Sequence, residues 1–219
     1  MRGARQRRSR QVSLVVVDLP PPRRRPNPLF HVLSPGDRLV RLFDPSRHGM
    51  TATGFRSHGP LLRFDHHRER DDGTPGNDPE RGVYYAATTL SGCLVEIFGD
   101  TGVVDLDRHH VALPVLRRDL RLLDLRGNGA MRAGTKAAVA KVAERGISQA
   151  WARHFYETTE IYDDVDGLVY LNAHNDEDAV ALYERAADAL ECSPERVICL
   201  LYTSPSPRDR TRSRMPSSA

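Results

Sequence analysis

The sequence predicts a single mixed α+β domain, and three observations support this. The chain has 219 residues, enough for one domain with a substantial core. Its composition, 39% hydrophobic and 28% charged, is typical of a globular protein. Segments with strand character outnumber those with helical periodicity, and the two do not alternate regularly, as a doubly wound parallel sheet would require.

Strand-forming residues gather in several short segments. Residues 39–43 alternate in polarity, and residues 82–87 are rich in β-forming side chains. Asp166 and Gly167 form a turn signal that leads into an apolar run. Further strands are expected at 120–125, 168–171 and 179–183, and two short ones between 103 and 116.

Helices are predicted from caps and from apolar spacing. Thr88 or Thr89 can cap a helix whose apolar face does not include Glu96. That face consists of Leu90, Leu94, Ile97 and Phe98. A second helix is expected over 135–145, with Thr135 as cap and Gly146 as stop.

A third helix is expected to begin with Ser148 as its cap. On it Trp151 and Phe155 pair at spacing i,i+4. Residues 184–190 are expected to form a further helix after the last strand. The many charged residues and histidines of 66–81 predict a solvent-exposed loop.

The two ends of the chain differ in character from the domain of residues 30–198. Residues 1–29 are rich in Arg and Pro and predict a disordered basic arm. Residues 199–209 read CLLYTSPSPRD, the translation of one frame of a widely used transposase sequencing adapter, and 213–219 match its next constant stretch. We therefore expect 199–219 to be a translated adapter, and a domain truncated after Ile198.

The distribution of charge argues against nucleic-acid binding. The whole chain carries +3, its first 25 residues +7 and its last 21 residues +3, which leaves −7 for residues 26–198. A basic isoelectric point that arises from the ends is weak support for a nucleic-acid partner. Without the tail only Cys93 and Cys192 remain, so the sequence predicts neither a structural zinc site nor a disulfide framework.

Familiar catalytic motifs are absent from the sequence. It contains no Walker loop, GxGxxG, HExxH or GxSxG pattern. The pairs at 66–67 and 109–110 are adjacent histidines, which on a strand point to opposite faces, so no metal site is predicted. No apolar run is long enough to cross a bilayer and no signal peptide is visible, so we expect a cytoplasmic protein.

Four segments occur in a characteristic order. Arg41 lies in a short strand, and LRFD follows at 62–65. GVYYA occupies 82–86, with Glu96 eleven residues after Tyr85. DGLVY at 166–170 is followed by a polar loop and VALYERA at 180–186. With the helix around SQAWAR at 148–153, this order resembles the RES domain, named for its Arg, Glu and Ser positions, over residues 37–190.

The resemblance implies an ADP-ribosyltransferase-like fold with a mixed sheet core and flanking helices. It further implies cleavage of NAD at the nicotinamide–ribose bond, with phosphate (an NAD phosphorylase) or water as acceptor. NAD is then a substrate, and no cofactor is expected. Many relatives are the toxin of a two-gene module, which implies a helix-turn-helix antitoxin as partner. A homodimer is also expected, without membrane or direct nucleic-acid contacts.

The resemblance also assigns the site. Arg41 and Arg63 would bind the diphosphate or an acceptor phosphate, since guanidinium groups form bidentate, charge-assisted hydrogen bonds to phosphate. Tyr85 would pack on the nicotinamide. Glu96 would be the central carboxylate, which stabilises an oxocarbenium-like transition state.

The motif serine has no counterpart here. Asn172 aligns at its position, and its amide can donate a hydrogen bond to phosphate but lacks a hydroxyl. His174, two residues later, could assist. Two alternatives to an active enzyme remain open: a degenerate RES module that binds a nucleotide or a partner without turnover, and a nucleic-acid-binding protein that works through its Arg-rich arm.

Overall fold

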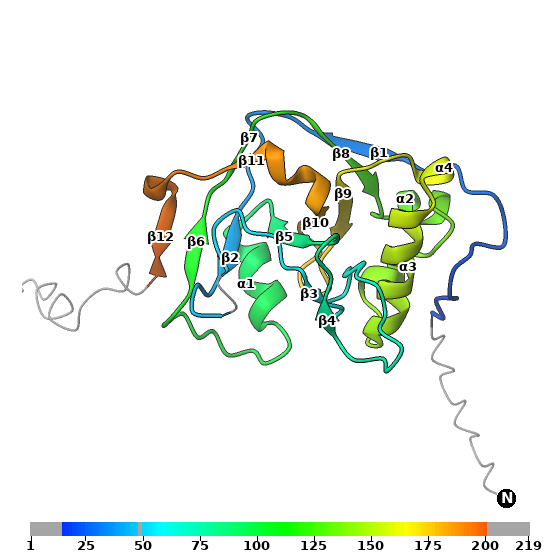
Figure 1. Ribbon diagram of the computed structural model, residues 1–219, viewed down its shortest axis with the longest axis horizontal. Helices are drawn as coiled ribbons and strands as arrows, with labels where there is room; N and C mark the ends of the chain where they lie inside the picture. The colour runs from blue at the N-terminus through cyan, green and yellow to red at the C-terminus, as the bar shows by residue number, and fades with distance from the viewer. Residues whose placement is uncertain (1–14, 48–49, 201–219) are drawn as a thin grey trace, which may run out of the picture.

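The main sheet has five strands and forms the centre of the molecule (Figure 1). The computed structural model describes residues 15–47 and 50–200. The strand order is β1 (Phe30–Leu33), β8 (Leu120–Asp124), β9 (Gly167–Leu171), β10 (Asp178–Tyr183) and β5 (Val83–Ala87). The β8–β9 pair is parallel and the other neighbours are antiparallel, which confirms a mixed sheet.

Three smaller sheets surround the main one. A three-stranded sheet contains β12 (Val197–Cys199), β6 (His110–Ala112) and β2 (Arg41–Phe43). A bridge between Val40 and Ala87 joins it to β5. The other two sheets pair β11 (Leu190–Glu191) with β7 (Val115–Leu116), and β3 (His58–Gly59) with β4 (Gly76–Asn77).

The helices lie at two sides of the main sheet. Helix α1 (Leu90–Phe98) lies beside β5 and β2, whereas α2, α3 and α4 lie together at the other side (Figure 1). Their bounds are Asn128–Arg132 (α2), Arg145–Glu157 (α3) and Thr159–Tyr162 (α4). Short 3₁₀ segments are η1 (Ala137–Ala140), η2 (Glu184–Ala189) and η3 (Pro194–Arg196). Residues 184–190, expected as an α-helix, thus form 3₁₀ turns and the start of β11.

The alternation of side chains along the strands divides the core into two faces. On one face Leu168, Tyr170 and Ala181 pack with Trp151 and Phe155 of α3. The rings of Trp151 and Phe155 are 5.4 Å apart between centroids, which confirms the predicted pair. The opposite face carries a second apolar cluster. That cluster includes Tyr84, Ala86, Leu122, Val169, Val180 and Leu182.

The prediction of an α-helix over 135–145 is wrong. Only Ala137–Ala140 is helical, as a 3₁₀ helix, and Gly146 lies in the first turn of α3 instead of ending a helix. The alanine-rich composition favours a helix, but burial of Val139 and Ala140 in the core overrides this weak local preference. Ser148 lies inside α3, where its hydroxyl donates to the Arg145 carbonyl, so it does not cap the helix.

Helix α1 begins where predicted, because Thr89 caps it. The Thr89 Oγ1 accepts a hydrogen bond from the Gly92 amide at 2.9 Å. Thr89→Ala is expected to lower the free energy of unfolding by about 1 kcal/mol, measured by urea denaturation. Thr88→Ala is the matched control, since its hydroxyl makes one weak contact of 3.4 Å to the Asp178 carbonyl. Equal losses in the two variants would contradict the cap.

The loop of residues 66–81 is not wholly exposed, contrary to the prediction. His66 and His67 have no exposed surface, and Arg81 is 9% exposed. The His66 ring packs between the rings of Tyr156 and Tyr183, with both centroid distances 4.4 Å. Sequence reasoning failed here because each of these side chains has a hydrogen-bond partner inside the protein, which lowers the cost of burying it.

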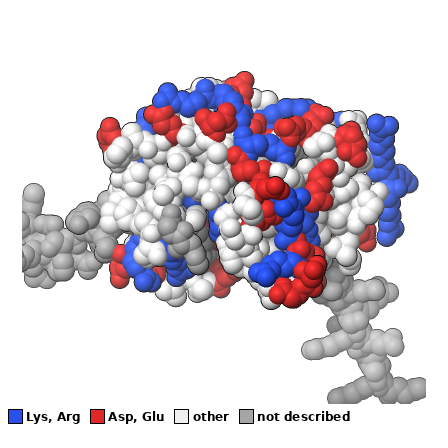
Figure 2. Space-filling view, viewed as in Figure 1, with Lys and Arg blue, Asp and Glu red and all other residues white. Residues whose placement is uncertain are grey.

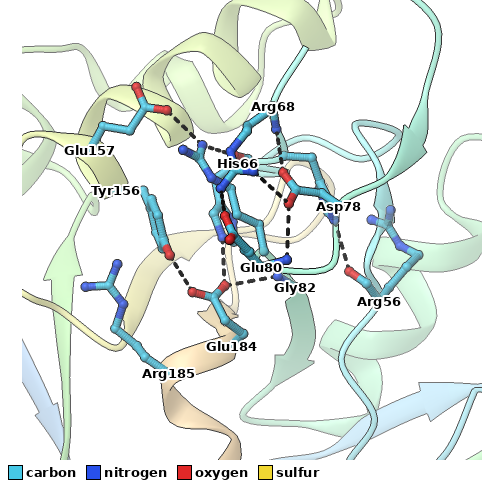
Figure 3. Close-up of polar contacts among 12 residues, drawn as sticks. Arg56, His66, Arg68, Asp78, Glu80, Gly82, Tyr156, Glu157, Glu184 and Arg185 are labelled. Atoms are coloured by element: carbon cyan, nitrogen blue, oxygen red, sulfur yellow. Dashed lines mark hydrogen bonds and ion pairs between the residues drawn. The ribbon is translucent and has the colours of Figure 1, made fainter. Parts of the chain in front are cut away.

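Glu184 is the acceptor that holds this loop in place (Figure 3). Its carboxylate accepts hydrogen bonds from the Tyr156 hydroxyl at 2.5 Å and the Gly82 amide at 3.0 Å, and lies 3.0 Å from His66 Nε2. Burial alone would raise the pKa of Glu184, but the hydrogen bonds from His66, Tyr156 and Gly82 outweigh it and lower the pKa to about 2. Burial lowers the pKa of His66.

These two shifts predict a loss of stability in acid. A carboxyl whose pKa is depressed in the folded state stabilises it above the unfolded value near 4.5, and this contribution is lost as the pH falls towards 2. Glu184→Gln should therefore cost about 1–3 kcal/mol of unfolding free energy at pH 7 and much less near pH 2. Urea denaturation at both values measures this. Glu144→Gln, at an exposed position, is the control; a loss for Glu184→Gln that does not change with pH would contradict the role of its charge.

The part of the N-terminal segment that the structure describes packs against the domain. Val17 is 6% exposed and belongs to the core. The Trp151 indole donates to the Asp18 carbonyl at 2.7 Å, and the Asn27 amide donates to the Arg132 carbonyl at 2.9 Å. Residues 15–29 thus differ from the disordered arm expected for 1–29, because Val17 and these backbone groups find partners on α2 and α3. Residues 1–14 lie outside the described residues.

The described chain ends in strand β12. Ile198 pairs with Val111 and Cys199 with His110, so the strand runs one residue into the segment attributed to an adapter. Leu200 packs against the apolar cluster of Val40, Leu42 and β6. The rest of that segment, 201–219, lies outside the described residues. Among the described helices, none has the length and apolar character needed to span a bilayer.

Candidate functional site

Two tyrosines flank a pair of alanines on the α3 face of the main sheet. Tyr170 of β9 pairs with Ala179 of β10, and Tyr85 of β5 pairs with Ala181. All four side chains belong to the same face. Ala179, whose side chain is small, lines a cavity together with both tyrosines. The register thus creates a shallow, aromatic-walled floor.

Helix α1 closes one side of this floor and places Glu96 over it. The helix approaches β5 closely at Gly92, where a Cβ would lie 3.0 Å from that of Ala87. Glu96 is half-buried, whereas Leu90 and Ile97 are 40% and 44% exposed. The face of α1 that was predicted from its apolar residues is therefore only partly buried. Glu96 does not lie on a solvent face but beside a cavity of about 50 Å³. The cavity is lined by Leu42, Tyr85, Ala86, Ala87, Cys93, Glu96, Ile97, Tyr170 and Ala179.

The Glu96 carboxyl lies among cationic side chains. Burial raises its pKa, which the charges of Arg63, His174 and Arg145 oppose. Asp100 lies at the rim, with its carboxylate 3.5 Å from His174 Nε2 and 3.8 Å from Arg145 Nη2. The site therefore combines one half-buried carboxyl with a rim that can attract a polyanionic ligand.

Arg63 reaches this rim from the loop between β3 and β4. Its guanidinium donates to the Val142 carbonyl, which links the loop to the segment before α3. The sequence prediction grouped Arg63 with Glu96, and the structure brings the two together, since their charges interact. The amide of Gln149 donates to the Leu62 carbonyl at 3.0 Å and adds a second link between the loop and α3.

Asp65 holds the same loop from inside. It has no exposed surface, and its two oxygens accept hydrogen bonds from Arg56 Nη2, at 2.7 and 2.8 Å. It also accepts from the amides of Leu61 and Leu62, at 2.5 and 2.9 Å. The Tyr85 hydroxyl donates to Asp65 at 2.9 Å, so one carboxylate aligns the Arg63 loop with the Tyr85 ring.

The structure places Arg41 away from Glu96. The Arg41 guanidinium lies 4.2 Å from the centroid of the Tyr84 ring, and burial lowers its pKa. Leu42 lines the Glu96 cavity, and successive residues of a strand point to opposite faces, so Arg41 points away from it. The Arg41 Nη1 is buried without a hydrogen-bond partner among the described residues.

Asn172 shapes the loop between β9 and β10. Its Oδ1 accepts hydrogen bonds from the amides of His174 and Asn175, both at 3.0 Å. Its Nδ2 donates to Asn175 Oδ1 at 2.5 Å. Asn172 has no exposed surface, so its amide orients the loop that carries His174. His174 packs on the end of α1, where a Cβ on Gly99 would lie 2.5 Å from its ring.

The sequence prediction did not assign Tyr170, Asp65 or Arg145 to the site. The Tyr170 hydroxyl is buried and has no partner among the described residues. Burial raises its pKa well above the usual value, with a further rise from the Glu96 charge. Tyr170 and Asp65 both lie within the motif segments of the sequence, and this position could have indicated that they belong to the site. Nothing in the sequence indicated Arg145, because only the fold brings the start of α3 to this rim. In the described ranges, no three His, Cys, Asp or Glu side chains are grouped so as to hold a metal ion.

Comparison of the sequence with protein-family models identifies the family of this chain. The family model of the RES domain matches residues 35–203, and so ends inside the segment 199–219. No curated protein matches. A solved structure, the M. tuberculosis MbcT–MbcA toxin–antitoxin complex, aligns with a TM-score of 0.46 and 13% identity over 76% of this chain and 87% of that chain. A likeness of this degree carries no argument about function.

Proposed function

Given that this chain belongs to the RES domain family, we propose that it cleaves NAD at the nicotinamide–ribose bond, with phosphate or water as acceptor. One observation carries the proposal: Glu96 is half-buried beside the Tyr85–Tyr170 floor and under a rim of Arg63, His174 and Arg145. A poorly solvated carboxylate can stabilise the positive charge that forms on the ribose when neutral nicotinamide leaves. The neighbouring cationic groups can bind the diphosphate of the same substrate.

Each part of the site has a chemical role in this proposal. The Glu96 carboxylate stabilises the positive charge that develops on the ribose as the glycosidic bond breaks. Arg63 and Arg145 bind the diphosphate, for which guanidinium groups are well suited. Tyr85 offers an aromatic surface to the nicotinamide ring. Asn172 acts indirectly, since its amide orients the loop of His174.

The dimensions of the cavity set how the ligand would bind. At about 50 Å³ it is far smaller than the 300–1,000 Å³ of typical ligand pockets. NAD would therefore lie mostly over the mouth of the cavity, along the rim of Arg63 and His174. We expect Ile97, which lines the cavity and is 44% exposed, to shift when the ligand binds.

The products of the reaction test the proposal directly. The full chain is incubated with NAD, with and without inorganic phosphate, and the products are separated and identified by mass. Hydrolysis yields nicotinamide and ADP-ribose, whereas phosphorolysis yields nicotinamide and phosphorylated ADP-ribose only when phosphate is present. NAD that remains intact in both reactions, while still protecting the protein from thermal unfolding, would instead support the binding-only alternative. That alternative is favoured because the Asn172 amide forms its hydrogen bonds within its own loop and not towards a ligand.

The pH dependence of cleavage follows from the environment of Glu96. Burial raises the pKa of Glu96 above its ordinary value of 4.5. Because the reaction uses the charged carboxylate, kcat/KM should fall on the acid side at a pH higher than 4.5. Rates measured across the acid range check this, and an acid limb at or below 4.5 would contradict it.

Assembly and compartment complete the proposal. The family resemblance supports a toxin role with a helix-turn-helix antitoxin as partner, and a homodimer as the form of the toxin. Its substrate is abundant in the cytoplasm, which is the proposed compartment. We expect the gene of such an antitoxin beside the gene of this chain. Its co-expression should relieve growth arrest caused by the chain alone, and growth arrest that persists would contradict the partnership.

A further inference from the structure

A larger hollow lies under the N-terminal segment, apart from Glu96. Residues 18–27 lie against α2, the residues that follow it and Trp151 of α3, and border a hollow of about 590 Å³. This lies within the range of ligand pockets, 300–1,000 Å³. The segment leads into β1, at the edge of the main sheet opposite to β5 and α1 (Figure 1). The hollow is lined by Asp18, Leu19, Pro21, Pro22, Arg23, Arg24, Arg25, Pro26, Asn27, Met131, Arg132, Gly134, Thr135 and Trp151.

The segment is fastened at both ends of the hollow, so the hollow exists without a ligand. At one end Val17 is buried and the Asp18 carbonyl accepts from the Trp151 indole at 2.7 Å. At the other end the Asn27 amide donates to the Arg132 carbonyl, and the Arg132 Nε donates back to the Asn27 carbonyl at 2.8 Å. A preformed site lowers the entropic cost of binding.

Guanidinium groups dominate the rim of the hollow. Arg24 and Arg25 are exposed, and no carboxylate of the described residues lies within ion-pair distance of either. Arg23 has only a long contact of 3.5 Å to Asp18. Exposed guanidinium groups that have no close carboxylate partner are suited to an anionic ligand.

We propose that this hollow binds a phosphate-bearing small molecule of the nucleoside diphosphate class. Arg24 and Arg25 bind the phosphates, whereas Met131, which is 63% exposed, supplies an apolar surface for the base. Figure 2 shows Lys and Arg side chains gathered at the edge that residues 18–27 occupy, whereas acidic and basic side chains are mixed along the top and in the centre of that view. The net charge of −7 over residues 26–198 disfavours a long polyanion such as a nucleic acid.

The single tryptophan of the chain reports on this hollow. Trp151 is the sole tryptophan and lines the hollow, so its fluorescence responds to a ligand there. Titration of the full chain with ADP should give a saturable change in Trp151 fluorescence. Arg24→Ala/Arg25→Ala should weaken ADP binding by about tenfold or more, because two charge-assisted contacts are lost. The same variant should cleave NAD at the unaltered rate.

Two control variants separate this site from the Glu96 site. Arg38→Ala/Arg196→Ala removes the same charge at exposed positions elsewhere and should leave the ADP titration unchanged. Arg63→Ala should impair NAD cleavage and leave the ADP titration unchanged. The proposal is overturned if ADP gives no fluorescence change, if Arg24→Ala/Arg25→Ala binds ADP as the original chain does, or if a single-stranded oligonucleotide or an acidic peptide binds there more tightly than ADP.

Discussion

Glu96→Gln is expected to reduce the kcat for NAD cleavage by about 100- to 1,000-fold, the effect of removing one preorganised electrostatic group from a transition state. Glutamine keeps the shape of the side chain and removes its charge. Because burial raises the pKa of Glu96, its charged form is disfavoured in the folded protein. The variant should therefore unfold at the same urea concentration as the original chain, or at a higher one. Single-turnover kinetics and urea denaturation measure the two quantities.

Glu144→Gln is the matched control for this substitution. It makes the same chemical change at an exposed position just before α3, and should alter neither rate nor stability. A rate within threefold of the original for Glu96→Gln would remove Glu96 from the centre of the reaction. Loss of both rate and stability would point to a structural role for Glu96, which its raised pKa does not support.

Asp65→Ala is expected to cause the largest loss of stability, about 3–5 kcal/mol of unfolding free energy. The substitution leaves the Arg56 guanidinium, whose side chain is 12% exposed, without its bidentate partner. It also leaves the amides of Leu61 and Leu62 and the Tyr85 hydroxyl without their acceptor. Urea denaturation measures the loss, provided the slope of the transition is unchanged.

Two variants make this result interpretable. Asp71→Ala, an exposed aspartate in the same region of sequence, should change the unfolding free energy by less than about 0.5 kcal/mol. Asp65→Asn keeps the side-chain volume and one acceptor oxygen, so it should lose less stability than Asp65→Ala. In Asp65→Asn the Arg63 loop is held less firmly, and we expect KM for NAD to rise more than kcat falls. An unchanged KM would contradict a role for Asp65 in aligning Arg63 with Tyr85.

The segments that could be predicted from sequence are those whose side-chain pattern matches their final burial. Strands β5, β9 and β10 carry β-forming residues and turn signals, and they formed as predicted. Thr89 formed the cap of α1 for the same reason, since a cap depends on residues within one turn. The helix predicted over 135–145 failed because packing of Val139 and Ala140 outweighed helix propensity.

The candidate site likewise contains residues that the sequence could indicate and residues whose position depends on the fold. The order of short motifs in the sequence was enough to group Arg63, Tyr85 and Glu96 and to establish the RES family. The motifs could not tell that Arg41 stacks on Tyr84, because which face of a short strand reaches a cavity depends on the neighbouring sheet. Nor could they tell that the Asn172 amide is used up within its own loop.

Local pattern in this chain therefore determined its fold class and its family, and it supplied Glu96 as the candidate for the central carboxyl. Only the tertiary structure decided which polar residues are buried. His66 was predicted to lie in a solvent-exposed loop, and nothing in the sequence indicated that Asp65 and Glu184 are acceptors that hold loops in place. The physical reason is that the free energy of a buried polar group depends on its partners, which here lie up to 118 residues apart in the chain.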